Sequence, residues 1–149
     1  MRGFTGTHRT IRLLVLSYLI AVPVSVMAQS GWQVLVRDDA KVEQLTTQQV
    51  KQLFMYPEGS CKVYRLKAID LAPESGRDYF YAQVLGYSAP RWRAHWSKIV
   101  FTGQGSPPEQ VSVSQVKERL LQSTETIGYL PLSEPVPSRM KQVFVIQSP

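Results

Sequence analysis

Residues 62–85, KVYRLKAIDLAPESGRDYFYAQVL, have the pattern of a strand, a tight loop and a helix. Apolar and charged side chains alternate over residues 62–70 with no glycine or proline between them, which predicts a β-strand. Residues 71–74 form the predicted loop, and the helix is expected over residues 75–85. Gly86 follows at the position where glycine commonly ends a helix.

The junction between loop and helix is a candidate anion site. Ser75 is predicted to be the N-cap, forming a capping box with Asp78. A helix N-terminus has unpaired N–H groups and a partial positive charge, which suit an anion. Gly76 would let a ligand approach the backbone, and Arg77 would grip phosphate, sulfate or carboxylate. We therefore predict Ser75, Gly76 and Arg77 as ligand-binding residues; the alternative is an ordinary cap with Arg77 facing water.

The composition is that of a globular protein rather than a disordered one. Of the 149 residues, 44% are hydrophobic and 19% are charged. The formal net charge is +6, but Arg2, Arg9 and Arg12 lie in an N-terminal segment that has no acidic residue. The rest of the chain therefore carries only about +3, which does not favour a nucleic-acid partner. It is compatible with a small anionic ligand.

The N-terminal 28 residues have the pattern of a signal peptide. Arg9 and Arg12 precede a short apolar core at residues 13–22, and residues 26–28 place small side chains at a cleavage site. Cleavage is predicted after Ala28, giving an exported, periplasmic mature protein. An uncleaved membrane anchor is the alternative, although the apolar run is shorter than the roughly 20 residues a span needs. Residues 29–149 are then expected to form a single domain.

The remaining chain shows few chemically reactive groups. Cys61 is the only cysteine, so no internal disulfide can form, and it is expected to be a small buried residue. His95 is the only histidine after the signal segment and has no partner at metal-ligand spacing. No nucleophile lies beside an evident base. We therefore predict no metal, no cofactor and no enzymatic activity.

Two helix starts combine a capping box with a hydrophobic staple. Thr46 with Gln49 begins the first helix, and Leu45 and Val50 are placed to pack across its cap. A second box is predicted at residues 112–115.

A third helix is expected after Ser88. Trp92, Trp96, Ile99 and Val100 fall on one face of this helix, which is expected to be buried. Residues 101–108 follow as a loop.

Strands are predicted at residues 32–37, 126–130 and 143–146, in addition to 62–70. Strands alternating with helices indicate an α/β layer fold, here a small mixed sheet flanked by about four helices. The strand at 62–70 carries Arg65 and Lys67 on the same face as apolar residues. It is therefore expected to lie at a sheet edge or to have one face only partly covered.

The ordered set of these segments resembles the phosphate-binding protein of bacterial phosphate ABC transporters, a type II periplasmic binding protein. The segments that carry the resemblance are 45–54, 68–70, 74–80 and 126–129. Short, single-module relatives are similar also at residues 96–97, 101–105 and 107–108. The resemblance extends from about Val34 to Ile146.

The resemblance implies part of a type II periplasmic binding fold and a non-enzymatic binding function. In the family, Ser-Gly-Thr at a helix start binds phosphate through hydroxyls and backbone N–H groups. Ser75 and Gly76 match this motif, and Arg77 replaces the threonine. The implied ligand is phosphate or another small oxyanion, and the implied partner is a membrane transporter or sensor. The alternative is a ligand-free periplasmic adaptor that keeps the fold.

Overall fold

The computed structural model describes residues 30–147. The signal peptide predicted at residues 1–28 and its cleavage site lie outside this range. The described chain contains a five-stranded mixed sheet in the order β3-β2-β4-β1-β5. β1 (Gly31–Arg37) pairs antiparallel with β4 (Thr126–Pro131) and β5 (Met140–Gln147). β2 (Lys67–Leu71) pairs parallel with β4 and with β3 (Glu109–Val111).

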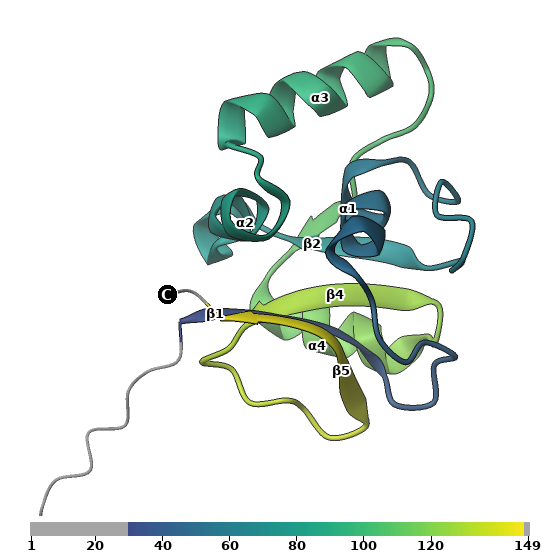
Figure 1. The fold of residues 1–149 in the computed structure, drawn as a ribbon, viewed down its shortest axis with the longest axis vertical. Helices are drawn as coiled ribbons and strands as arrows, with labels where there is room; N and C mark the ends of the chain where they lie inside the picture. The colour runs from purple at the N-terminus through teal and green to yellow at the C-terminus, as the bar shows by residue number, and fades with distance from the viewer. Residues whose placement is uncertain (1–29, 148–149) are drawn as a thin grey trace, which may run out of the picture.

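The helices form layers around this sheet (Figure 1). α1 (Thr47–Met55) and the short α2 (Arg77–Phe80) lie on one side, and α4 (Val113–Gln122) lies on the other. α3 (Ala89–Phe101) is an outer helix that packs on the π-helical turn η2 (Tyr81–Leu85) rather than on the sheet. The α/β class and the mixed sheet with four α-helices are as the sequence predicts.

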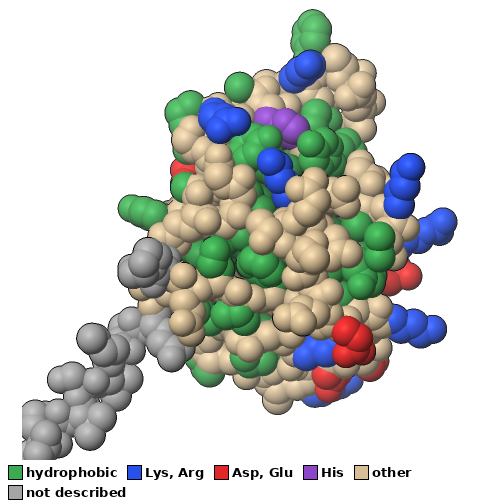
Figure 2. All heavy atoms as spheres, viewed as in Figure 1, with side chains coloured by type: hydrophobic (Ala, Val, Ile, Leu, Met, Phe, Trp, Pro, Cys, Tyr) green, Lys and Arg blue, Asp and Glu red, His purple; other side chains and the backbone are tan. Residues whose placement is uncertain are grey.

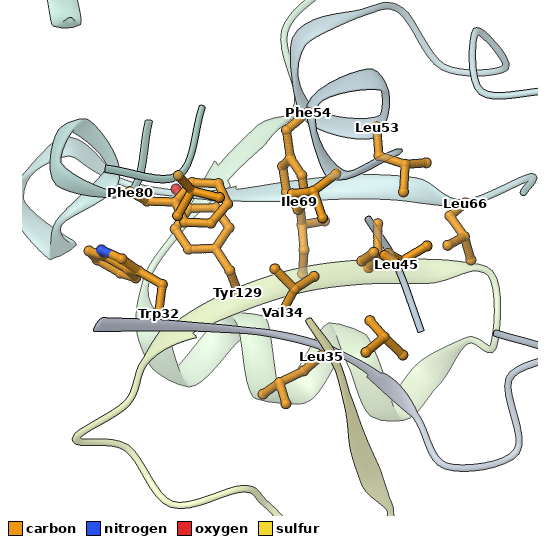
Figure 3. Packing of buried hydrophobic residues seen from close by; sticks show 14 of the residues in the cluster. Trp32, Val34, Leu35, Leu45, Leu53, Phe54, Leu66, Ile69, Phe80 and Tyr129 are labelled. Atoms are coloured by element: carbon orange, nitrogen blue, oxygen red, sulfur yellow. The ribbon is translucent and has the colours of Figure 1, made fainter. Parts of the chain in front are cut away.

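The core gathers where β1, β2 and β4 face α1 and α2 (Figure 3). Phe80 stacks on Tyr129 with ring centroids 3.6 Å apart, and Trp32 and Phe54 meet this pair edge-on. All four rings are buried. This aromatic cluster, Trp32, Phe54, Phe80 and Tyr129, fixes the α2 turn against the sheet.

Two of the three predicted capping boxes are present. The Thr46 hydroxyl accepts from Gln49 N, and the Gln49 side chain accepts from Thr46 N at 2.8 Å. Ser112 and Gln115 repeat the arrangement at the start of α4. These bonds satisfy N–H groups that a helix start otherwise leaves unpaired.

We expect Thr46→Ala to lower the free energy of unfolding by about 1 kcal/mol, because the helix loses its capping acceptor. The measurement is urea denaturation followed by circular dichroism. Thr47→Ala is the control, since Thr47 is exposed just inside the same helix and makes no capping bond. Equal losses in the two variants would show that the cap does not contribute.

The strand predicted at residues 62–70 is wrong at both ends, since β2 spans Lys67–Leu71. Its neighbours decide where it starts, because Lys67 pairs with Thr126 at the beginning of β4. Of the two expected placements, the sheet edge is wrong, because β2 lies between β3 and β4. The other, a face that is only partly covered, agrees with the start of the strand, where Lys67 is exposed. Arg65, which suggested an exposed face, precedes the strand.

Ser75 is not the predicted N-cap. It ends a 3-10 turn, η1 (Pro73–Ser75), and Gly76 caps α2 with φ 100° and no side-chain hydrogen bond. The Asp78 carboxylate bonds Arg77 instead of closing a capping box. The helical segment changes from α to π at Tyr81 and ends before Gly86, as predicted.

The outer elements are less buried than their composition indicates. Val100 on α3 is 52% exposed, whereas Trp92, Trp96 and Ile99 are buried as predicted. Ser88 occupies the N-cap of α3 but makes no side-chain capping bond. The predicted strand at 143–146 extends to Met140–Gln147 at an edge of the sheet, and its exposed residues are Gln142, Val145 and Gln147.

Candidate functional site

The three predicted ligand-binding residues lie together in the turn after the carboxyl end of β2. Ser75 N donates to Ala72 O, and Gly76 N donates to Pro73 O at 3.2 Å, so these two N–H groups are used inside the turn. Positive φ at Gly76 then directs the chain into α2. Carboxyl ends of parallel strands are where α/β sheets commonly bind ligands.

Some polar groups of this turn have no internal partner. Within the described chain, the half-buried Ser75 hydroxyl makes no hydrogen bond. Arg77 and Asp78 are the first two residues of α2, and the first N–H groups of a helix have no partner inside that helix. These donors are the start of a cradle for an anion. One side of Gly76 is closed, because a Cβ placed there would lie 2.8 Å from Trp32 Cη2.

Arg77 does not face water, the alternative raised by its sequence position. The residue is only 4% exposed, and its guanidinium lies 4.1 Å from the centroid of the Trp92 ring. Nε and Nη2 both donate to Asp78 Oδ1, at 2.9 and 2.7 Å. Nη1 makes no hydrogen bond in the described chain, and the side chain as a whole is only 5% exposed.

Directly behind the turn lies a buried carboxyl that sequence reasoning missed. Asp70 accepts hydrogen bonds from Tyr81 at 2.9 Å and from Tyr129. Burial raises the pKa of Asp70 to about 7, although both tyrosine hydrogen bonds and the charge of Arg77 act to lower it. Burial, followed by the charge of Asp70, also raises the pKa values of both tyrosines well above their ordinary range. The sequence feature that could have indicated this carboxyl was an acidic residue near the end of an apolar strand.

A cleft of about 970 Å³ lies elsewhere, at the amino ends of the parallel strands. Lys67, Glu109 and Thr126, which begin β2, β3 and β4, all line it. Its other charged residues are of both signs: Glu58, Lys62, Arg65, Arg119 and Glu125. Ser75, Gly76 and Arg77 are not part of this cleft.

The other two candidate residues, Cys61 and His95, lie against other parts of the fold. Cys61 is buried and free, as predicted. His95 on α3 hydrogen-bonds the Met55 carbonyl at the end of α1. Basic side chains are scattered over the face in Figure 2 without forming one continuous patch.

Residues 30–147 contain no group of three or more His, Cys, Asp or Glu side chains placed to hold a metal. None of the helices in this range has the length and apolar character of a membrane span.

Comparison with known proteins places the fold. No protein-family model matches the chain, and no curated protein matches it by sequence. An ABC-type phosphate transport receptor from Vibrio cholerae aligns with a TM-score of 0.55 and 16% identity, over 78% of this chain and 46% of the receptor. A putative phosphate ABC transporter substrate-binding protein from Clostridium perfringens, solved with bound phosphate, aligns with a TM-score of 0.55 and 19% identity.

The second alignment covers 78% of this chain and 45% of the Clostridium protein. This chain therefore spans about half the length of the solved structures it matches. At these identities the likeness concerns the fold. The chain has the fold of part of a phosphate ABC transporter substrate-binding protein.

Proposed function

We propose that this protein is an exported, non-enzymatic binding module that takes phosphate or a similar oxyanion at the turn formed by Ser75, Gly76 and Arg77. The observation that carries the proposal is the Ser75 hydroxyl, which has no hydrogen-bond partner in the described chain and lies beside the start of α2 in a fold shared with phosphate receptors. Residues 29–149 would form the single binding domain after cleavage of residues 1–28. The periplasm is the proposed location, and a membrane transporter or sensor is the proposed partner.

Each residue has a distinct part in the proposed site. The Ser75 hydroxyl and the N–H groups of Arg77 and Asp78 would donate to the anion, and Arg77 Nη1 would add a charged donor. The positive φ of Gly76 sets the direction of these donors. The Asp78 carboxylate already neutralises part of the Arg77 charge. We therefore expect Arg77 to bind the anion more weakly than a guanidinium group without a carboxylate partner would.

The test is calorimetric titration of the purified protein with phosphate and with sulfate. We expect saturable binding that Ser75→Ala weakens about tenfold, the loss of one hydrogen bond to a charged group. Ser75 suits this test because its hydroxyl makes no hydrogen bond in the described chain. Arg77→Ala is expected to abolish binding. Ser97→Ala is the control, since Ser97 lies exposed on α3.

A ligand-free adaptor is the second candidate, and the engagement of Arg77 with Asp78 and Trp92 favours it. In that case a folded protein would show no saturable heat with either anion. Equal phosphate affinity in the unmodified protein and Ser75→Ala would exclude this turn as the site.

A further inference from the structure

Asp70 lies at the centre of a hydrogen-bond chain that joins four elements of the fold. Leu71 N on β2 donates to Tyr129 Oη on β4 at 3.3 Å, and Tyr129 Oη donates to Asp70 Oδ1. Asp70 Oδ2 lies 2.9 Å from Tyr81 Oη in η2, and Tyr81 Oη lies 3.2 Å from the Phe54 carbonyl on α1. Asp70, Tyr81 and Tyr129 are all buried.

Counting hydrogens shows that this chain lacks one proton when Asp70 is ionised. The Tyr81 hydroxyl has a single hydrogen but lies within bonding distance of two acceptors, Asp70 Oδ2 and the Phe54 carbonyl. If it donates to the carboxylate, the Phe54 carbonyl, in the last turn of α1, loses this donor. If Asp70 Oδ2 carries a proton, it donates to Tyr81, and Tyr81 donates to Phe54. Each of these hydrogen bonds then has its own hydrogen, donated from Asp70 to Tyr81 and from Tyr81 to the Phe54 carbonyl.

Within residues 30–147, no cationic side chain forms a hydrogen bond with Asp70 that would compensate for its burial. Tyr129 on β4, Tyr81 in η2 and Arg77 on α2 are the titratable or charged side chains of the described chain that act on it. Arg77 acts only through its charge, because its bonded donors go to Asp78. α1 contributes the Phe54 carbonyl, while β3 and α4 contribute no charged neighbour. A buried carboxylate without a bonded cation is costly, and protonation removes that cost.

We propose that Asp70 keeps a proton in the folded protein up to neutral pH, and that this proton makes the junction of β2, β4, η2 and α1 a pH-sensitive link. The raised pKa of Asp70, about 7 in the folded chain against the ordinary value of 3.8, supports the same assignment. Between these two pH values the folded state binds a proton that the unfolded state does not. Stability from this group is therefore fully present below about pH 4 and is lost as the pH rises to about 7.

The test compares the unmodified protein with Asp70→Asn by urea denaturation at pH values from 4 to 8. Asparagine is always uncharged, so the difference in free energy of unfolding between the two proteins isolates Asp70. We expect this difference to shift against the unmodified protein as the pH rises, with a slope corresponding to about one proton, and to level off above pH 7. Asp38→Asn, which alters an exposed carboxyl, is the control and should not produce this slope between pH 5 and 7.

Carbon-13 NMR of the aspartate carboxyl groups keeps the proposal testable if Asp70→Asn does not fold. In the unmodified protein we expect the Asp70 carboxyl to be still protonated at pH 5.5 and to titrate near pH 7. An Asp70 carboxyl already ionised at pH 5.5 would overturn the proposal. A stability difference that stays flat, or that rises in favour of the unmodified protein with pH, would overturn it as well. None of these outcomes depends on anion binding.

Discussion

Phe80→Ala is expected to lower the free energy of unfolding by about 3–5 kcal/mol, because it empties the centre of the aromatic cluster. Phe80 is fully buried, and its ring stacks nearly parallel to the ring of Tyr129 with the two centroids 3.6 Å apart. It also meets Trp32 and Phe54 edge-on. These rings come from β1, β4 and α1, so no single neighbour can move to fill the space.

Denaturation in urea, followed by tryptophan fluorescence, measures this loss. Small domains are stable by about 5–15 kcal/mol, so Phe80→Ala removes a large share of the total. Phe101→Ala is the matched control, since Phe101 is 93% exposed at the end of α3. We expect that control to change stability by less than about 0.5 kcal/mol. A loss below about 1 kcal/mol for Phe80→Ala would mean that this cluster is not packed as described.

Gly76→Ala is expected to cost about 2–4 kcal/mol, from two separate effects. The φ of 100° at Gly76 is a conformation that side chains disfavour. In addition, the new Cβ would lie 2.8 Å from Trp32 Cη2. Trp32 cannot easily move away, because its indole N–H donates to Gln83 at 2.7 Å and its ring packs on Phe80 and Tyr129.

Gly59→Ala separates these two effects. Gly59 also has a positive φ, 85°, but a Cβ added there would meet nothing within 4 Å. We expect it to cost only about 1–2 kcal/mol, the backbone effect alone. Thermal and urea unfolding of both variants give the comparison. If Gly59→Ala proves as costly as Gly76→Ala, the contact with Trp32 does not constrain the turn.

Local sequence signals predicted the capped starts of α1 and α4, although the cap predicted at Ser75 is wrong. A capping box needs only a hydroxyl residue and a glutamine three positions later, so Thr46 with Gln49 was readable without knowing what packs nearby. Gly86 was readable as a helix end for the same reason, since its left-handed conformation is a property of one residue. The buried stripe of Trp92, Trp96 and Ile99 follows from helical spacing.

The ends of the strands and their positions in the sheet could not be predicted from local sequence signals. The alternating pattern of residues 62–70 satisfies the local rule for a strand, but strand pairing requires a neighbouring strand. β4 reaches β2 only from Thr126, opposite Lys67, so residues 62–66 remain outside the sheet. The place of β2 between β3 and β4 depends on segments that lie about 40 and 60 residues further along the chain.

For the candidate site, the sequence alone determined that Ser75, Gly76 and Arg77 stand together at a turn before a helix, because adjacency in the chain ensures proximity. Only the tertiary structure decided what each residue does there. In the folded chain, Ser75 ends a 3-10 turn and does not cap the helix. Trp32 lies against Gly76. Arg77 lies between Asp78 and Trp92.

Asp70 shows the same division most clearly. Its identity as an acid at the end of an apolar strand was visible in the sequence. Its raised pKa was not, because this pKa results from burial beside Tyr81 and Tyr129, which approach from different elements. Local conformation depends on neighbours in the chain, whereas desolvation depends on neighbours in space, and these neighbours are fixed only when the whole sheet and its helices have packed.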